Sequence, residues 1–575
     1  MDMEETPNIA AEPICFISKS KFIAGLQCPK REWLQVYRPE LAVETATDIK
    51  EQGSLVGKAA RDAFRGGVLV DIPSYNSTFD KAAAETKRLM EDPNVQIVFE
   101  GAFSASGVRV RVDVLIRRGD GWSLGYAPVN GEDYSVGEII GEVKASTKVK
   151  ESHIWDASLQ AYILRKCGVN VPDVAVIHLN RKGSSTEITG NVAAHVPADT
   201  YAQMGGGYIW DGAMNDDGTR KYNFAELFVT VPITPVPDSE IVTELNKQFR
   251  ILGQPTEPSA TCGSQCTKPY ACEFAKRCHE GLPIDDLVYM PNVFGSTKWS
   301  QIDKLRNLGV VSICSIDSNK FPKTKSKIER VQDAFKSGSV TADSQKLVEW
   351  QRKLKFPINF LDYETVAYAL PNIKGTKPWD AVPMQLSNHR LDADGTLTHQ
   401  EFLGEADGTD PRVPFIEVLL AAVGTEGTIV TYSMFEFNNV NEPLAKRYPQ
   451  YAERLRALKE RAWDMCAVVK DCVYHPKFRG SFSIKTVLPV LVPGMSYENL
   501  AIGSGIDVSP AWDRLLNKCT PAAEHQQLRV DLLAYCGQDT MAMVQVLEVL
   551  VGLSGQNVAS VNFLKPLSKA QKAGA

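Results

Sequence analysis

Apolar and polar residues alternate strictly in "GVRVRVDVLIRRGDGW", residues 107–122. Four valines share one face of an extended chain, whereas Arg109, Arg111 and Asp113 share the other. The Asp-Gly pair that follows is a turn signal, so the segment predicts a β-hairpin. "EIIGEVKAST" (138–147) predicts a further short strand, on which Glu142 and Lys144 project from one face. The pattern therefore presents an acid and an acid–lysine pair on strands of one sheet.

A second group of acids lies later in the chain. "INFLDYETVAY" (358–368) begins as a buried strand and presents Asp362 and Glu364 on one face. "GTIVTYSMFEFNNV" (427–440) predicts a strand followed by a helix, with Glu436 at the junction. "QLRVDLLAYCGQDTMAMVQVLEVL" (527–550) predicts a helix on which Tyr535 and Asp539 stand one turn apart. The first of these strands and the last helix can bring three acids, Asp362, Glu364 and Asp539, and Tyr535 to one place.

Helix and strand patterns alternate along most of the chain, which predicts an α/β protein. We expect disorder over 1–14, an α/β domain over 15–282, a helical linker over 283–350, a second α/β domain over 351–555 and a loose tail over 556–575. In the linker, "STKWSQIDKLRNLGVVSICSID" (296–317) is similar to half of a helix-hairpin-helix element, a device that binds DNA backbones. A plain helical linker is the alternative.

Composition limits the partners. The 575 residues carry a net charge of -6, so the chain is not a polycation and any nucleic acid must contact local basic patches. Such a patch is "NKFPKTKSKIER" (319–330), although a solvated surface is the alternative interpretation. Its candidate phosphate contacts are Lys323, Lys325, Lys327 and Arg330. The N-terminus lacks a signal peptide and no apolar run is long enough to span a membrane, so we expect a cytoplasmic protein without a membrane partner.

Cysteines cluster in "CGSQCTKPYACEFAKRC" (262–278), where four thiols occupy seventeen positions. In a reducing compartment such clusters favour metal over disulfides. Cys266, Cys272 and Cys278 are evenly spaced, and Cys28 lies near the start of the same predicted domain. Four thiolates suit an iron–sulfur cluster or zinc. Structural zinc sites usually contain close cysteine pairs, which this segment lacks, so an iron–sulfur cluster is favoured.

The two groups of acids suit the same chemistry. Carboxylates on neighbouring strands chelate Mg²⁺ or Mn²⁺, and a nearby lysine or tyrosine can orient the attacking water. Asp113, Glu142 and Lys144 form the first candidate set; edge-strand charges that meet solvent are the alternative. Asp362, Glu364 and Asp539, with Tyr535, form the second. Asp464 in "RAWDMCAVV" is an alternative third acid for this set.

The first set resembles the RecB-type branch of the PD-(D/E)xK nucleases. There an Asp and a Glu-x-Lys pair precede a helix with a catalytic Gln, and "DASLQAYIL" places Gln160 accordingly. The sequence departs from the branch where a tyrosine is expected, since Leu164 stands there and Tyr162 two residues earlier. Gly57 occupies the place of a frequent metal-binding His, and Glu100 is a candidate substitute carboxylate.

The second set resembles the DnaQ-like exonucleases in their tyrosine variant, with Asp-x-Glu on the first strand and Tyr-x3-Asp on the last helix. In that resemblance Glu436 takes the place of an Asp, one methylene longer.

Long stretches of the chain resemble a little-described bacterial family that joins an iron–sulfur RecB-type domain to a DnaQ-like domain. The resemblance rests on "ISKSKFIAGLQCPKREWL", "CTKPYACEFAKRC", "NFLDYETVAYALPNIKGTKPW", "HPKFRGSFSIKTVLPVL" and "YCGQDTMAMV". It implies a restriction-endonuclease-like domain followed by an RNase H-like domain. It also implies a 4Fe-4S cluster on Cys28, Cys266, Cys272 and Cys278, with Cys262 left outside the ligand set.

The expected function is that of a metal-dependent nuclease with a RecB-like site and a 3'-5' exonuclease-like site. DNA is the expected nucleic acid, in repair or anti-phage defence, with a helicase or another defence protein as a candidate partner. The alternative is a nucleic-acid-binding scaffold in which one or both sites are degenerate, which the departures at Gly57, Leu164 and Glu436 favour.

Overall fold

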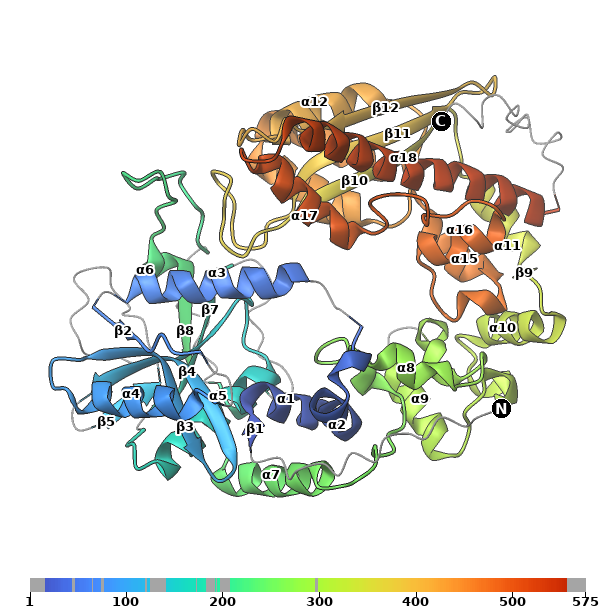
Figure 1. Ribbon diagram of the computed structural model, residues 1–575. Helices are drawn as coiled ribbons and strands as arrows, with labels where there is room; N and C mark the ends of the chain where they lie inside the picture. The colour runs from blue at the N-terminus through green and yellow to red at the C-terminus, as the bar shows by residue number, and fades with distance from the viewer. Residues whose placement is uncertain are drawn as a thin grey trace. The chain divides into compact units, whose positions relative to one another are not determined.

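The computed structural model describes residues 16–43, 47–64, 66–73, 77–118, 121–124, 141–171, 173–181, 192, 194–196, 207–294 and 298–555. The expectations for residues 1–14 and for the tail 556–575 lie outside these residues. The protein is mixed α/β, as predicted (Figure 1). It divides into two compact units, Met1–Glu280 with Tyr368–Asp380, and Gly281–Ala367 with Ala381–Ala575.

The first unit contains two described sheets. One has the strand order β1-β4-β3-β2, with β5 paired to β4, and the other the order β6-β7-β8. The predicted hairpin is confirmed, because β4 and β5 pair antiparallel. The strands are β1 (Ile17–Ser18), β2 (Val68–Leu69), β3 (Ile97–Ala105), β4 (Val108–Arg118), β5 (Gly121–Leu124), β6 (Gly141–Lys144), β7 (Ala175–Leu179) and β8 (Phe228–Pro232).

The helices of the first unit bury one face of these sheets. The four valines of β4 are at most 1% exposed, so the alternation read from the sequence is the alternation of core and surface. The helices are α1 (Lys19–Gln27), α2 (Pro29–Tyr37), α3 (Thr47–Ala63), α4 (Phe79–Glu91), α5 (Glu151–Lys166), α6 (Phe224–Leu227), α7 (Asp238–Leu252) and α8 (Ala275–Glu280).

The second unit is built around a five-stranded sheet of order β12-β11-β10-β13-β14. β10 pairs antiparallel with β11 and parallel with β13, so strand pairing changes from antiparallel to parallel at β10. The strands are β10 (Ile358–Val366), β11 (Val382–Leu391), β12 (Leu397–Leu403), β13 (Thr428–Thr431) and β14 (Ala462–Asp464); β9 (Thr341–Ala342) and β15 (Val473–Tyr474) pair separately.

Helices pack on both faces of this sheet, with α12 on one and α18 on the other (Figure 1). The helices are α9 (Lys298–Asn307), α10 (Lys325–Ser337), α11 (Ser344–Gln351), α12 (Arg412–Val423), α13 (Glu442–Arg447), α14 (Ala452–Glu460), α15 (Met465–Cys472), α16 (Ile484–Leu491), α17 (Gly505–Leu516) and α18 (Ala522–Leu553). A short π-helix, Glu436–Asn441, precedes α13. No helix among the described residues is both long and apolar enough to cross a membrane.

The segment between β10 and β11 belongs to the first unit rather than to the second. Its backbone exchanges hydrogen bonds with Trp210, and the indole of Trp379 donates to the carbonyl of Ala145 over 2.6 Å. The Ala369 amide donates to the buried Gln52 side chain. Ala369 is fully buried in the core of the first unit, so residues 368–380 form part of that core.

Candidate functional site

Three carboxylates meet at β10 in the second unit. Leu361 and Tyr363 point toward α12, where the Tyr363 ring lies edge-on to Phe415. By strand alternation, Asp362 and Glu364 therefore face α18. α18 supplies Asp539, and one oxygen from each of these three acids lies within 4.8 Å of the others. Asp362, Glu364 and Asp539 therefore lie together in the structure, as predicted.

Crowding and burial make this carboxylate group costly to ionise. Burial, together with the Asp539, Glu364 and Glu436 carboxylates, holds the pKa of Asp362 well above its usual range. Burial, then Asp539, raises the pKa of Glu364 to about 8. The pKa of Asp539 is also raised, mainly by burial. Several acids held together in a low-dielectric site repel one another unless protons or a cation neutralise them.

Lys485 and Tyr497 also belong to this site, although neither was predicted from the sequence. The Lys485 ammonium donates to the Tyr535 hydroxyl over 2.7 Å, and the Tyr497 hydroxyl donates to Asp539 Oδ1 over 2.6 Å. The positive charge of Lys485 partly offsets the rise in the pKa of Glu364 and of Asp539. Lys485 was visible in "HPKFRGSFSIK", which the sequence analysis used only for the resemblance. Tyr497 carries no sequence signal, because its role depends on the packing of the loop after α16.

Glu436 lies at the first position of the π-helix and is 4% exposed. Burial, with Asp464 nearby, raises the pKa of Glu436 to about 8. Its Oε2 atom is buried without a hydrogen-bond partner among the described residues. Asp464 instead caps α15 by accepting from the Ala467 amide over 2.8 Å. A capping carboxylate already has its partner, so the geometry favours Glu436 over Asp464 as a further ligand.

The first unit gathers a second polar group around Asp156. Lys144 Nζ donates to Asp156 Oδ2 over 2.6 Å, and Gln160 Nε2 donates to Asp156 Oδ1 over 3.0 Å. Asp113 Oδ2 accepts from the Val143 amide over 3.0 Å, which ties β4 to the strand of Lys144. Lys19 Nζ lies 3.9 Å from both Asp113 Oδ1 and Asp156 Oδ1. Asp113, Lys144 and Gln160 therefore lie together, as predicted.

The sequence analysis missed Asp156 and Lys19. A signal existed for Asp156, which stands four residues before Gln160 and hence on the same face of α5. Glu142 lies on β6 opposite Val176 in the register, and its side chain lies outside the described residues.

The positions at which the sequence departs from the RecB-type motif have other neighbours in the structure. Glu100 lies 3.5 Å from Arg61 and 3.9 Å from Arg111. Tyr162 and Leu164 are both buried in the hydrophobic core of the first unit. Gly57 lies on α3 with Arg61 as its nearest side chain. Among the described residues, no histidine takes the place that Gly57 leaves.

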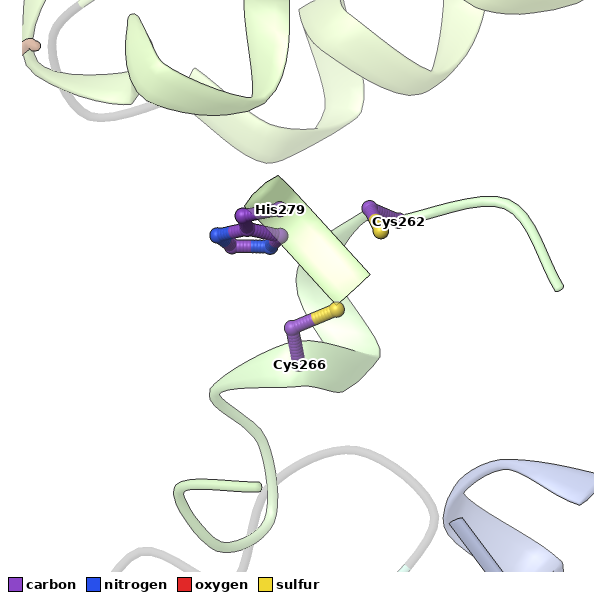
Figure 2. Close-up of side chains that lie close together, drawn as sticks. All are labelled: Cys262, Cys266 and His279. Carbon is purple, nitrogen blue, oxygen red and sulfur yellow. The ribbon is translucent and has the colours of Figure 1, made fainter. Parts of the chain in front are cut away.

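Five cysteines of the first unit line one small cavity. Cys28 follows α1, and the others come from the segment before and within α8; the lining thiols are Cys28, Cys262, Cys266, Cys272 and Cys278. The four predicted cluster ligands therefore share a pocket. Cys262, which the prediction left outside the ligand set, lines it too. Cys262, Cys266 and His279 place one donor atom each within 4.8 Å of one another (Figure 2).

The thiols of this pocket differ in acidity. A hydrogen bond from Cys262, and a smaller effect of His279, lower the pKa of Cys266 to about 4. A hydrogen bond from Cys262, with the charge of Lys30, lowers the pKa of Cys278 to about 6. Burial raises the pKa of Cys272 to about 11. Cys266 and Cys278 therefore favour the thiolate that binds metal cations, whereas the pKa values of Cys28, Cys262 and Cys272 are raised.

The predicted phosphate contacts lie around α10. Arg330 is 8% exposed and lies 3.5 Å from Asp343, so its guanidinium is part of the packing. Lys325 lies 3.8 Å from Glu329 and Lys327 lies 3.7 Å from Asp471. Lys323 is exposed.

Comparisons with known proteins leave the function open. Residues 359–483 match the sequence model of a family described as a domain of unknown function (DUF2779). The match contains Asp362, Glu364 and Glu436 and ends before α18. The chain is also 23% identical to the uncharacterised protein MG366 of Mycoplasma genitalium over 261 residues, which are 41% of this chain and 38% of that protein. No solved structure matches significantly.

Proposed function

We propose that the protein is a metal-dependent nuclease that hydrolyses phosphodiester bonds in DNA. The observation that carries the proposal is the convergence of Asp362, Glu364 and Asp539 within 4.8 Å of one another. The Glu436 carboxylate, which has a buried, unpartnered oxygen among the described residues, is close enough to raise the pKa of Asp362 and Glu364. Oxygen ligands in this number suit Mg²⁺ or Mn²⁺. When bound, such an ion activates water and neutralises charge on the phosphate. Burial raises the pKa of these acids, and a bound cation would offset that cost by stabilising their ionised forms.

The protein's own groups have distinct roles in this proposal. Asp362, Glu364 and Asp539 hold the cation, and Tyr497 fixes the orientation of Asp539 by its hydrogen bond. Tyr535, held by Lys485, orients the attacking water. The location supports this assignment, because ligands of open α/β sheets bind beyond the carboxyl ends of the strands where the strand order reverses. The order reverses at β10, since β11 and β12 lie on one side of it and β13 and β14 on the other.

We also propose a fold type for each of the two units. A sheet of three antiparallel strands continued by two parallel ones supports an RNase H-like, DnaQ-type second unit with 3'-5' exonuclease activity. The group of Asp113, Lys144, Gln160 and Asp156 supports a PD-(D/E)xK-like first unit. The shared pocket of Cys28, Cys266, Cys272 and Cys278 supports a 4Fe-4S cluster that joins the two ends of that unit.

The test is digestion of end-labelled single- and double-stranded DNA of each polarity, with Mg²⁺, with Mn²⁺ and with a chelator. We expect stepwise shortening from the 3' end that requires the metal and falls to background in Asp362→Asn. Glu401→Gln, an exposed acid on β12 of the same sheet, is the matched control and should retain full activity. Undiminished cleavage by Asp362→Asn and Asp539→Asn would refute the assignment of this site.

A nucleic-acid-binding scaffold is the second candidate for the first unit. It is favoured by Lys144, whose ammonium donates to Asp156 over 2.6 Å. If Asp362→Asn abolishes all cleavage of linear and circular DNA while DNA affinity persists, the first unit binds without cutting. A residual activity that Asp113→Asn then removes would assign cleavage to the first unit as well.

A further inference from the structure

The cysteine pocket contains more metal-binding side chains than a four-thiolate cluster uses. Five cysteines line it, and His279 from α8 stands beside them. A 4Fe-4S cluster is held by four cysteine thiolates. Cys262 and His279 are therefore left over from the predicted ligand set, yet with Cys266 they form the tightest group of donors in the pocket. Both residues are close to Cys266, which the cluster would also use.

The spacing of this group suits a single ion. One donor atom each of Cys262, Cys266 and His279 lies within 4.8 Å of the others, grouped around α8 (Figure 2). Two sulfurs bound to one zinc ion can lie at most about 4.6 Å apart, because each Zn–S bond is about 2.3 Å long. The 4.8 Å limit on the separations of these three donors is therefore close to the span of the ligands of one ion. The thiolates of a cubane cluster bind different irons and must lie further apart.

Cys278 is the candidate fourth donor, although its thiol is not part of that 4.8 Å group. It precedes His279 in the chain, lines the same pocket, and its backbone oxygen accepts from the Cys262 thiol over 3.6 Å. All four donors lie within the eighteen residues 262–279, so they can assemble without Cys28, which comes from the other end of the unit. Three thiols and an imidazole are ligands of Zn²⁺ rather than of Mg²⁺.

We infer that Cys262, Cys266, Cys278 and His279 form a binding site for a single Zn²⁺-class ion, in competition with the four-cysteine cluster for Cys266 and Cys278. The pocket would then bind either a cluster whose ligands extend from Cys28 to Cys278 or one ion held within residues 262–279, but not both at once. The inference concerns the pocket alone and does not depend on the nuclease activity.

The test uses the full chain, stripped of metal under anaerobic reducing conditions and titrated with Co²⁺ as the probe. We expect one Co²⁺ per chain with tetrahedral visible bands and a thiolate charge-transfer band, displaced by Zn²⁺. Thiolate charge transfer distinguishes this site from the carboxylate site, which contains only oxygen ligands. Cys262→Ser and His279→Gln should each weaken Co²⁺ binding about tenfold or more.

Two thiols of the same pocket provide the matched controls. Cys28→Ser and Cys272→Ser should leave Co²⁺ affinity within about threefold of the unsubstituted protein. Equal weakening by Cys28→Ser and Cys262→Ser, or intact tetrahedral binding in His279→Gln, would overturn the inference. Circular dichroism of each variant checks the fold, and His279→Gln tests the site even if a cysteine variant fails to fold. Loss of cleavage in Asp362→Asn with intact Co²⁺ binding would confirm that the two sites are separate.

Discussion

Replacing Glu32 with glutamine should stabilise the first unit at neutral and alkaline pH. Glu32 lies on α2 and is fully buried, and neither carboxylate oxygen has a hydrogen-bond partner among the described residues. The nearest part of α7 presents Gln248, whose Oε1 atom is buried and likewise unpartnered. The charged groups that act on Glu32 are Lys21, Glu244 and Lys247. A protonated carboxyl or an amide can donate to Gln248, whereas a carboxylate cannot.

The size of the effect follows from the pKa. Burial, then the Glu244 carboxylate, raises the pKa of Glu32 from 4.5 to about 8. The folded state therefore binds a proton that the unfolded state has released between these pH values, and stability falls as pH rises through that window. The shift is about 3.5 pKa units, and each unit is worth about 1.4 kcal/mol, so the loss above the folded-state pKa is on the order of 5 kcal/mol. Glutamine does not ionise, so Glu32→Gln should remove this loss.

The assay is hydrogen exchange of peptides from α1, α2 and α7 at pH 5 and pH 8, after correction for intrinsic exchange rates, because a chain of two units need not unfold in one step. The unsubstituted protein should lose protection relative to Glu32→Gln at pH 8 and match it at pH 5. Glu51→Gln, an exposed acid on α3, is the control and should behave as the unsubstituted protein at both pH values. Equal or lower protection in Glu32→Gln at pH 8 would refute the reasoning.

Three more outcomes are expected. Lys485→Met should lower kcat about tenfold or more and move the acid limb of the pH profile upward, because Lys485 lowers the pKa of Glu364 and Asp539; Lys485→Arg should restore part of the rate. Trp379→Phe removes the donor to the Ala145 carbonyl and should cost about 1 kcal/mol, measured as faster hydrogen exchange in peptides covering 368–380. Changing Lys323, Lys325 and Lys327 together to glutamine should reduce the salt dependence of DNA binding by up to about three in log–log slope, and an unchanged slope would assign these lysines to the solvated surface.

Local patterns sufficed for the elements that carry the acids. The alternation in β4 and β10 and the one-turn spacing of Tyr535 and Asp539 depend only on neighbouring residues, and the structure realises them. The strand order of the second unit could not be read in this way, since pairing depends on contacts between distant segments. The assignment of residues 368–380 to the first unit was likewise invisible, because nothing in "ALPNIKGTKPWD" specifies which core receives it.

The same distinction applies to the sites. Asp362, Glu364 and Asp539 were found because a strand and a helix each present them at fixed spacing. Lys485, Tyr497, Lys19 and Asp156 were missed because their roles arise from tertiary packing rather than from spacing. Cys262 was left outside the ligand set that the family resemblance implies, yet it lines the same pocket as those ligands.

The placement of residues 368–380 has a consequence for the order of folding. The core of the first unit contains Ala369, which the ribosome adds about ninety residues after the last residue of the unit's main segment, Glu280. During synthesis the core of the first unit therefore stays incomplete until β10 and the following residues 368–380 have emerged from the ribosome. We expect nascent chains stalled between residues 300 and 360 to be cleaved readily by protease within 16–280, and chains stalled beyond about 420 to resist it. The late arrival of this segment makes completion of the first unit dependent on synthesis of the first strand of the second unit's main sheet.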